Sequence, residues 1–233
     1  MTANNEEEFR YPFEERCAKV LQEIRETTEF EVHLAQLDEI VWALDVAETV
    51  FEELAEEEDL PLSRRVQEYF FRYGAVEAAW RSRRPDTALV GEFKLHHIMS
   101  AVAGKRMTKF WRGEDDAERA LYNDLRIVDD TPQTGSGRMA LLRATPGATD
   151  PQVWFFDMRQ GAVRMELDYP AYLETLLVTK GVIGWQYLYC APEDCGMGFI
   201  PLVDGLKEML DVFPRLFPDH DYTDLRARLE ARL

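Results

Sequence analysis

Three short runs of strand-like composition follow one another in the second half of the chain, and turn residues separate them. The runs cover 138–145, 153–159 and 162–167, and the links contain Thr-Pro-Gly at 145–147 and Arg-Gln-Gly at 159–161. Gly and Pro at such positions favour tight turns. Parallel strands need a crossover of about a dozen residues or more, which these links do not provide. The pattern therefore predicts an antiparallel meander.

Helices are predicted on both sides of this meander. The first begins at Pro12, whose fixed φ suits a first helical turn, and Cys17 lies on its apolar stripe as a packed thiol. A longer helix with near-heptad apolar spacing is predicted at 34–58, and an aromatic helix at 61–73 with Gly74 as its C-terminal cap. Further helices are expected at 115–125, 169–180 (capped by Gly181), 202–216 and 222–233 (with Asp221 as N-cap), and a strand at 89–95. The order of elements predicts an α+β fold with a mostly antiparallel β-sheet flanked by helices.

Charge is distributed very unevenly along the chain. The formal net charge is −17, and residues 1–60 contain 19 Asp/Glu against 4 Lys/Arg, which leaves about −2 for residues 61–233. We therefore divide the chain into an acidic N-terminal helical extension, 1–60, and a main α+β domain, 61–233, with the boundary at Leu60-Pro61. A short basic cluster at 81–84 is expected to face the acidic helices.

This charge restricts the class of partner. An acidic segment repels nucleic acid and anionic membranes, because both bind basic surfaces. It attracts a basic protein and accelerates that encounter at low salt. The alternative interpretation is a solvated helical face that keeps the protein in solution.

The composition also indicates the compartment. No apolar stretch reaches the length of a membrane helix, and the N-terminus is acidic where a signal peptide is basic. Three cysteines, Cys17, Cys190 and Cys195, cannot all pair with one another, which is typical of a reducing compartment. We expect a cytoplasmic protein without a membrane partner.

Motifs for catalysis are weak. The stretch 134–137 (Thr-Gly-Ser-Gly) lacks the lysine and the helix of a phosphate loop. Cys190 and Cys195 could supply two corners of a zinc site, but no second pair lies nearby, and the adjacent His96 and His97 point different ways on a regular element. We assign no catalytic residue, metal or cofactor.

Carboxylates leave a metal-dependent enzyme as a third hypothesis. Glu166 and Asp168 would share one face of a strand, so that with Asp157 they could bind a cation or act as acid and base. Such pairs also arise by chance in a chain with 44 acidic residues.

Aromatic residues gather in or beside the predicted sheet, where most are expected in the core and any exposed one would be a natural anchor for a protein partner. A basic partner would bind acidic side chains around an aromatic or aliphatic centre. The candidate partner-binding residues are Glu52, Glu53, Glu56, Asp129, Asp130, Trp111 and Asp157.

The order of several segments resembles the SUKH superfamily over about residues 50–190. In that family a Leu-Pro pair leads into an aromatic helix that ends at a glycine, and paired strands, a helix and an aromatic segment follow. The matching segments here are Leu60-Pro61 with Phe70-Phe71 and Gly74, 153–157 (VWFFD), 161–167, 169–177 and 184–188 (GWQYL). The double glycine common in the family is Gly74-Ala75 in this chain.

The resemblance implies an α+β domain without a catalytic centre. Bacterial members of the family are often immunity proteins that bind and neutralise a toxin, frequently a nuclease, and fungal members include regulators of cell-wall synthesis that act as interaction hubs. Our first hypothesis is therefore an immunity protein for a basic toxin. The second is a regulatory or structural adaptor, in which the two N-terminal helices form a homodimer through their apolar seam.

Overall fold

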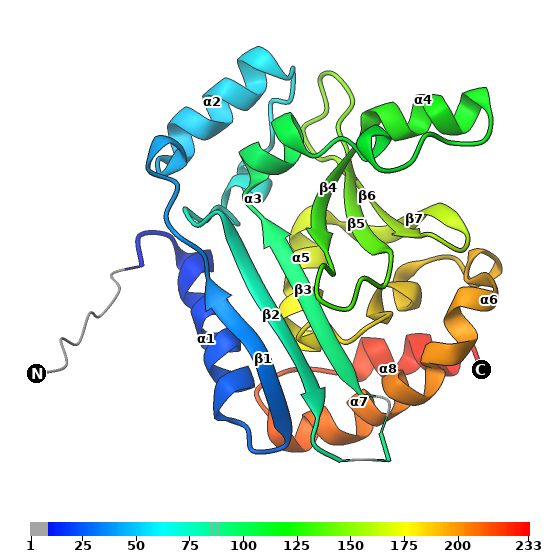
Figure 1. The fold of residues 1–233 in the computed structure, drawn as a ribbon. Coiled ribbons are helices and arrows are strands. Elements are labelled where there is room, and N and C mark those ends of the chain that lie inside the picture. Colours follow the sequence, from blue (N-terminus) through cyan, green and yellow to red (C-terminus); the bar gives the residue numbers. More distant parts are fainter. Residues whose placement is uncertain (1–8, 85, 88) are drawn as a thin grey trace, which may run out of the picture.

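The computed structural model describes residues 9–84, 86–87 and 89–233, and its strands form one sheet. The sheet is a seven-stranded antiparallel meander in which spatial order follows chain order (Figure 1). The strands are β1 (Phe30–Leu37), β2 (Ala75–Ser82), β3 (Val90–His96), β4 (Leu125–Asp130), β5 (Arg138–Arg143), β6 (Gln152–Asp157) and β7 (Gly161–Asp168).

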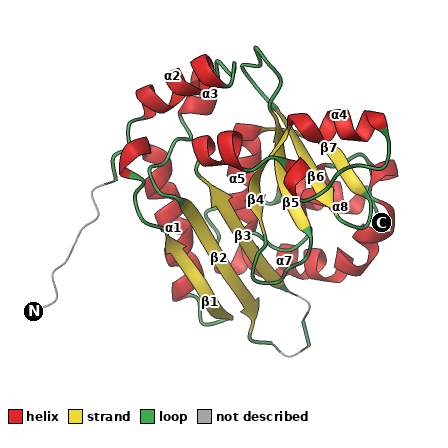
Figure 2. Ribbon diagram, turned by 45° about the horizontal axis from the view of Figure 1, so that its top comes forward, coloured by secondary structure: helices red, strands yellow, loops and turns green. Residues whose placement is uncertain are grey.

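Helices cover both faces of this sheet unequally (Figure 2). The α-helices are α1 (Pro12–Glu26), α2 (Ala47–Glu57), α3 (Arg64–Gln67), α4 (Asp116–Asp124), α5 (Tyr169–Thr179), α6 (Gly196–Phe199), α7 (Val203–Leu216) and α8 (Thr223–Glu230). Helices α1, α5, α7 and α8 pack on one face and bury the larger core with it. Helix α4 packs on the other face of the β4–β6 region, where Tyr122, Ile127 and Phe156 belong to a second, smaller core. None of the helices in the described residues is both long and apolar enough to span a bilayer.

The predicted α+β class and the antiparallel meander are confirmed. The predicted helices at 115–125, 169–180, 202–216 and 222–233 correspond to α4, α5, α7 and α8. Gly181 has φ +70°, and the residue before it, Lys180, is also left-handed at φ +51°, so the end of α5 is a two-residue reversal. Asp221 accepts a hydrogen bond from Thr223 N (2.9 Å) where α8 begins, but the N-cap position is Tyr222, so the prediction of Asp221 as N-cap is wrong by one residue.

The helix predicted at 34–58 is wrong in its first half. Residues 30–37 form β1, and the helix begins only at Ala47. Phe30, Val32, Ala35 and Leu37 pack against the core along an extended strand, in which a bulge after Val32 shifts the register. The spacing of Leu34 and Leu37 fits a heptad as well, so periodicity alone did not separate the two interpretations.

The helix predicted at 61–73 is also mostly wrong. Only α3 forms there, and the chain then extends so that Tyr73 pairs with Ile40 in an isolated bridge. Gly74 is not a helix cap: its N–H donates to Glu39 O and its carbonyl accepts from His97 N. The buried Phe70 and Phe71 face different parts of one interior, which favours an irregular path over a one-sided helix.

The boundary predicted at residue 60 falls inside one continuous core. β1 is an edge strand of the shared sheet, and the apolar faces of α1 and α2 lie in the same core as β2. The apolar helix faces that the predicted homodimer would use are thus packed inside the core of the chain itself. In the described residues the basic cluster at 81–84 forms its ion pairs at the start of β1 and not with the acidic helices α1 and α2, through Arg81–Glu31 (2.7 Å) and Arg84–Glu29 (3.0 Å).

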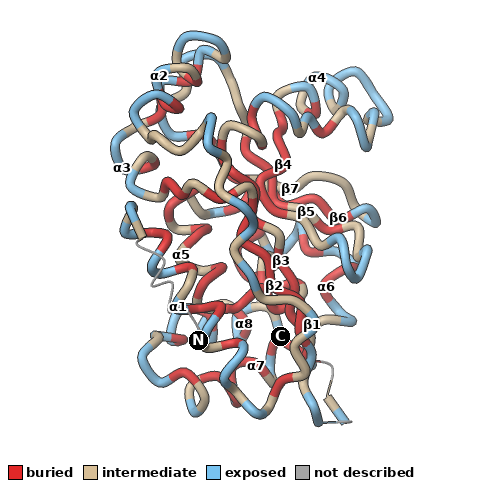
Figure 3. Tube along the Cα trace, turned by 60° about the vertical axis from the view of Figure 1, so that its left-hand side comes forward, coloured by how far each residue is buried: buried red, intermediate tan, exposed pale blue. Residues whose placement is uncertain are grey.

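The sheet narrows at its centre, between β3 and β4. These strands pair only at Lys94–Asp130 and Leu95–Asp129. The remaining edge of β3 pairs instead with the segment after α5, where Glu92 N donates to Gly181 O (2.8 Å) and Ile183 N to Val90 O (2.9 Å). In Figure 3 the central strands β2 to β6 are largely buried, whereas the edge strands β1 and β7 are mostly intermediate or exposed.

A buried lysine ties the C-terminal segment to α1. Lys180 is fully buried, and its Nζ donates to Glu23 Oε2 (2.8 Å) and lies 4.0 Å from the centre of the Phe217 ring. His220 Nε2 lies 3.3 Å from the same carboxylate oxygen. Glu23 loses hydration through burial, but the hydrogen bonds from His220 and Lys180 outweigh that effect and lower its pKa to about 2.

Replacing Glu23 by Gln should therefore destabilise the fold, because Lys180 would remain buried without a counter-charge. We expect a loss of about 2–3 kcal/mol in the free energy of unfolding, below the range for fully buried pairs because Glu23 is partly exposed. Urea unfolding at pH 7 measures it, with Arg81→Ala in the exposed Arg81–Glu31 pair as the matched control that should change little. Equal stability of Glu23→Gln and wild type would show that the buried pair contributes nothing.

Candidate protein-binding surface

Helix α2 presents a row of carboxylates to solvent. Val50, Phe51 and Leu54 are buried, which turns Glu48, Glu52 and Glu56 outward at i, i+4 and i+8. No lysine or arginine occurs between Arg25 and Arg64. Residues 38–59 alone contain ten carboxylates: Asp38, Glu39, Asp45, Glu48, Glu52, Glu53, Glu56, Glu57, Glu58 and Asp59.

Only some of these carboxylates have a basic side chain nearby. Asp45 lies 3.9 Å from Arg10, and Glu58 lies 3.7 Å from Arg106. Within the described residues, the row Glu48, Glu52 and Glu56 forms no ion pair. Like charges at i, i+4 destabilise a helix by about 0.2–0.5 kcal/mol per pair, and carboxylates in its last turn oppose the helix dipole. The row therefore costs stability, which a binding role would explain.

An exposed tryptophan lies in the turn before α2. Trp42, in the short 3₁₀ helix η1 (Trp42–Leu44), is 78% exposed, while Ile40 and Leu44 on either side pack against the core. Two hydrogen bonds hold this turn, from Val41 N to Arg72 O (3.0 Å) and from Leu44 N to Val41 O (2.7 Å). Because Ile40 and Leu44 on either side pack against the core, the Trp42 indole lies in solvent.

Trp42 lines a surface hollow of about 550 Å³. Its other lining residues are Leu37, Asp38, Glu39, Ile40, Arg72 and Tyr73. The Arg72 guanidinium is held by the buried Glu14, with Nε–Oε1 and Nη2–Oε2 distances of 2.9 Å, so its charge is compensated from inside. Asp38 and Glu39 are exposed and give the hollow a negative rim.

The hollow adjoins an ionic cluster on the outer face of β2 and β3, in front of which Figure 1 shows no helix of the described chain. Glu77 and Lys94 are directly opposite in the register, and their side chains lie 2.6 Å apart. The hydrogen bond to Glu77 raises the pKa of Lys94, and the charges of Asp130 and Asp38 add to that shift. Asp130 also lies 3.2 Å from His96 Nε2. Glu77 and His96 are buried in this cluster, and Lys94 and Asp130 are half-buried.

The structure separates the predicted partner-binding residues. Glu52 and Glu56 lie exposed on α2, with Glu53 half-buried beside them, and Asp130 lies half-buried in the ionic cluster. Trp111 is half-buried and packs on Phe156, with ring centroids 5.5 Å apart, so it covers the second core.

Asp129 and Asp157 are interior residues, and their prediction as surface contacts is wrong. Asp157 is fully buried and accepts hydrogen bonds from Arg138 Nε and Tyr187 Oη, both at 2.8 Å. Asp129 accepts from Tyr172 Oη (2.6 Å) and from Lys94 N (2.9 Å). The sequence does not show which carboxylate of a strand faces inward, because a shift of one residue in the pairing register moves every side chain to the opposite face of the sheet.

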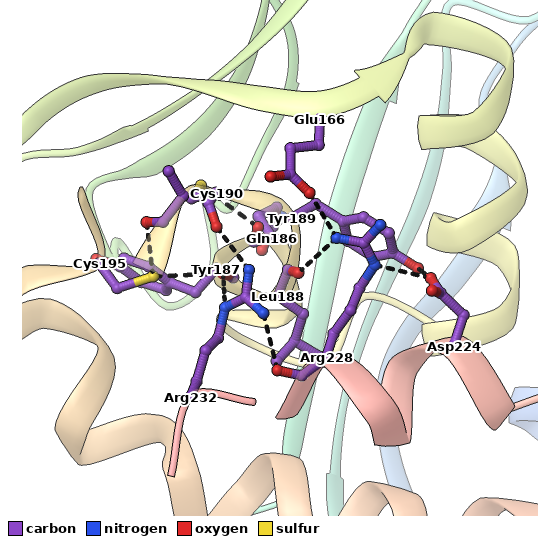
Figure 4. Close-up of polar contacts among 11 residues, drawn as sticks. Glu166, Gln186, Tyr187, Leu188, Tyr189, Cys190, Cys195, Asp224, Arg228 and Arg232 are labelled. Carbon is purple, nitrogen blue, oxygen red and sulfur yellow. Dashed lines mark hydrogen bonds and ion pairs between the residues drawn. The ribbon is translucent and has the colours of Figure 1, made fainter. Parts of the chain in front are cut away.

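The candidate catalytic and metal residues have structural partners. Glu166 pairs with Arg228 (2.7 Å), and Asp168 caps α5 by accepting from Ala171 N (2.9 Å). Cys190 and Cys195 are buried, and their thiols donate to carbonyls of the segment 186–191 (Figure 4). Among the described residues no three His, Cys, Asp or Glu side chains converge in a way that could hold a metal ion.

Trp42 is the residue that sequence reasoning missed. It falls inside the helix predicted at 34–58 but outside the apolar repeat of that helix. A large aromatic residue off the apolar repeat, between Asp38 and Asp45, was the available signal for an exposed anchor.

The comparisons with known proteins returned no match to a protein-family model, to a characterised protein or to a solved structure. Function is therefore argued from the chemistry of the surface.

Asp129 gives the fold a distinctive dependence on pH. Burial raises its pKa from 3.8 to about 7, although the hydrogen bond from Tyr172 acts in the opposite direction. The folded state thus keeps a proton that the unfolded chain has lost, and stability falls as pH rises from about 4 to 7. His97 has the opposite effect on stability. Burial lowers its pKa to about 4, so its contribution to the free energy of unfolding increases as pH rises from about 4 to 6.5.

Comparison with Asp129→Asn isolates the Asp129 contribution. The amide retains an acceptor for Lys94 N and can donate to Tyr172 Oη. As pH rises from 4 to 8, we expect the difference in unfolding free energy between variant and wild type to change by on the order of 2–4 kcal/mol in favour of the variant. Urea unfolding across that range measures it, with the exposed Asp204→Asn as control. Parallel curves for Asp129→Asn and wild type would contradict a carboxyl protonated near neutrality.

Proposed function

We propose that this chain is a non-catalytic protein-binding module of the immunity type, which neutralises a basic toxin, such as a nuclease, in the cytoplasm. The observation that carries the proposal is the exposed Trp42 beside the unpaired carboxylate row of α2. In protein interfaces a few aromatic residues often contribute most of the binding energy, and polar or charged residues surround them.

The sign of the charge selects the partner. A carboxylate row spaced about 6 Å apart along a helix repels nucleic acid and attracts lysine and arginine clusters. Such clusters form the substrate surface of a nuclease, so one acidic protein can cover the site that its toxin uses. Electrostatic attraction would also make association fast, which protects a cell from a toxin present at low concentration.

The resemblance to the SUKH superfamily supports the same proposal through the paired strands β6 and β7 and helix α5, whereas the aromatic helix ending at Gly74 that the resemblance includes does not form. The chain has an α+β fold with an antiparallel sheet, as that resemblance implies. The carboxylates examined for catalysis are used in helix capping and ion pairing, as for Asp168 and Glu166. A binding surface without reacting groups accounts for these features.

Neutralising the row should slow association with the partner. The partner is first captured from a lysate of the source organism at low salt, identified, and shown to be a toxin by growth arrest on expression. For Glu48→Gln/Glu52→Gln/Glu56→Gln we expect an association rate constant about ten-fold lower at low salt, with a small change in dissociation. The difference should vanish near 1 M salt, where the Debye length is about 3 Å.

The matched control removes three exposed carboxylates elsewhere, in Glu193→Gln/Asp194→Asn/Glu230→Gln. It carries the same net charge as the α2 variant and should associate close to the wild-type rate. Equal slowing by both variants would mean that only net charge matters and that α2 is not the interface. Recovery of the protein itself as the sole partner would favour the adaptor hypothesis.

A further inference from the structure

The hollow beside Trp42 contains two of the three components of a guanidinium site. Trp42 supplies an exposed aromatic ring, and Asp38 and Glu39 supply exposed carboxylates on the same rim. A planar cation that stacks on the ring and reaches a carboxylate would complete the arrangement. The charge of Arg72, the basic residue among the lining residues, is already compensated by Glu14.

A completed arrangement of this kind occurs inside the same molecule. The Arg228 guanidinium lies 4.3 Å from the centre of the Tyr189 ring (Figure 4). Its Nε donates to Asp224 (2.9 Å) and its Nη1 donates to Glu166 (2.7 Å). This contact shows the geometry of an arginine held by one aromatic ring and two carboxylates. The Trp42 hollow offers the ring and the carboxylates to solvent.

We propose that the hollow formed by Trp42, Asp38 and Glu39 receives an arginine side chain of the protein partner. The proposal rests on the proposed function, since it assigns the anchor of that interface. Arginine fits better than lysine because its guanidinium is planar, stacks on aromatic faces and can pair with a carboxylate through two N–H groups. Lysine is a compact and strongly hydrated charge that benefits less from the ring.

The test uses two blocked hexapeptides of equal charge, acetyl-Gly-Arg-Gly-Arg-Gly-Arg-amide and its lysine counterpart. Binding to the full chain is followed by the indole N–H resonance of Trp42, assigned with Trp42→Phe. We expect the arginine peptide to shift this resonance and to bind about two- to five-fold more tightly than the lysine peptide. Trp42→Leu keeps an apolar side chain without a π face and should abolish the preference.

Two carboxylate variants complete the experiment. Asp38→Asn/Glu39→Gln should weaken both peptides, whereas Glu193→Gln/Asp194→Asn, two exposed carboxylates at η5 (Pro192–Asp194), should weaken neither. Because Trp42 is largely exposed, its variants should fold, and their unfolding curves check this. Equal affinity for the two peptides in wild type, or an unchanged preference in Trp42→Leu, would overturn the arginine site.

The two proposals fail in different experiments. Loss of the arginine preference would remove the assigned anchor and leave the slower association of the α2 variant untouched. Conversely, an α2 variant that binds its partner at the wild-type rate would remove the electrostatic interface, while the hollow would still distinguish the two peptides.

Discussion

The fold depends on a junction in which one carboxylate acts as part of the sheet. β3 and β4 share two residue pairs, and beyond them Asp129 supplies a side-chain acceptor to Lys94 N. Tyr172 donates to the same carboxyl and so fixes α5 against the sheet. Without this acceptor the part-buried backbone N–H of Lys94 would lose its partner at the narrowest point of the sheet. The junction positions Lys94 and Asp130, and through them the outer face of β2 and β3 that adjoins the Trp42 hollow.

Carboxylates of this acidic chain are divided between two roles. Buried and half-buried ones are satisfied by internal donors: Glu14 by Arg72, the half-buried Glu23 by Lys180, and Asp157 by Arg138 and Tyr187. Such pairs gain little over apolar packing but are costly to break, so they fix a single arrangement of α1 and the C-terminal segment. In the part of the chain that the structure describes, the carboxylate row of α2 makes no such contact, and repulsion between its neighbouring charges weakens the helix. The net charge of −17 is therefore informative only after the paired residues are set aside.

The β5–β7 part of the meander could be predicted because its turns are short and contain Gly or Pro, and β3 from its apolar run at 89–95. β2 could not, since Ala75–Trp80 is buried on both faces and shows no alternation. β4 begins directly after α4, without a turn residue to separate Asp124 from Leu125. At the surface, the charge asymmetry identified Glu52 and Glu56 correctly as exposed, because a solvent-facing helix side is a local property. Trp42 could have been identified as exposed from its place off the apolar repeat, but the turn that presents it depends on the bridge between Ile40 and Tyr73, a long-range contact.

The two parts of the surface would act on different steps of binding. Coulombic attraction by the α2 row acts over a Debye length, about 10 Å at 0.1 M salt, and discriminates poorly among basic proteins. An interface built from it alone would be fast and unselective. Stacking on Trp42 acts only at contact and demands a side chain of the right shape at one position, which affects dissociation and specificity. Two residues separate η1 from α2, so the ring lies close in the chain to the first carboxylate of the row, and a partner held by both would combine fast association with selective contact.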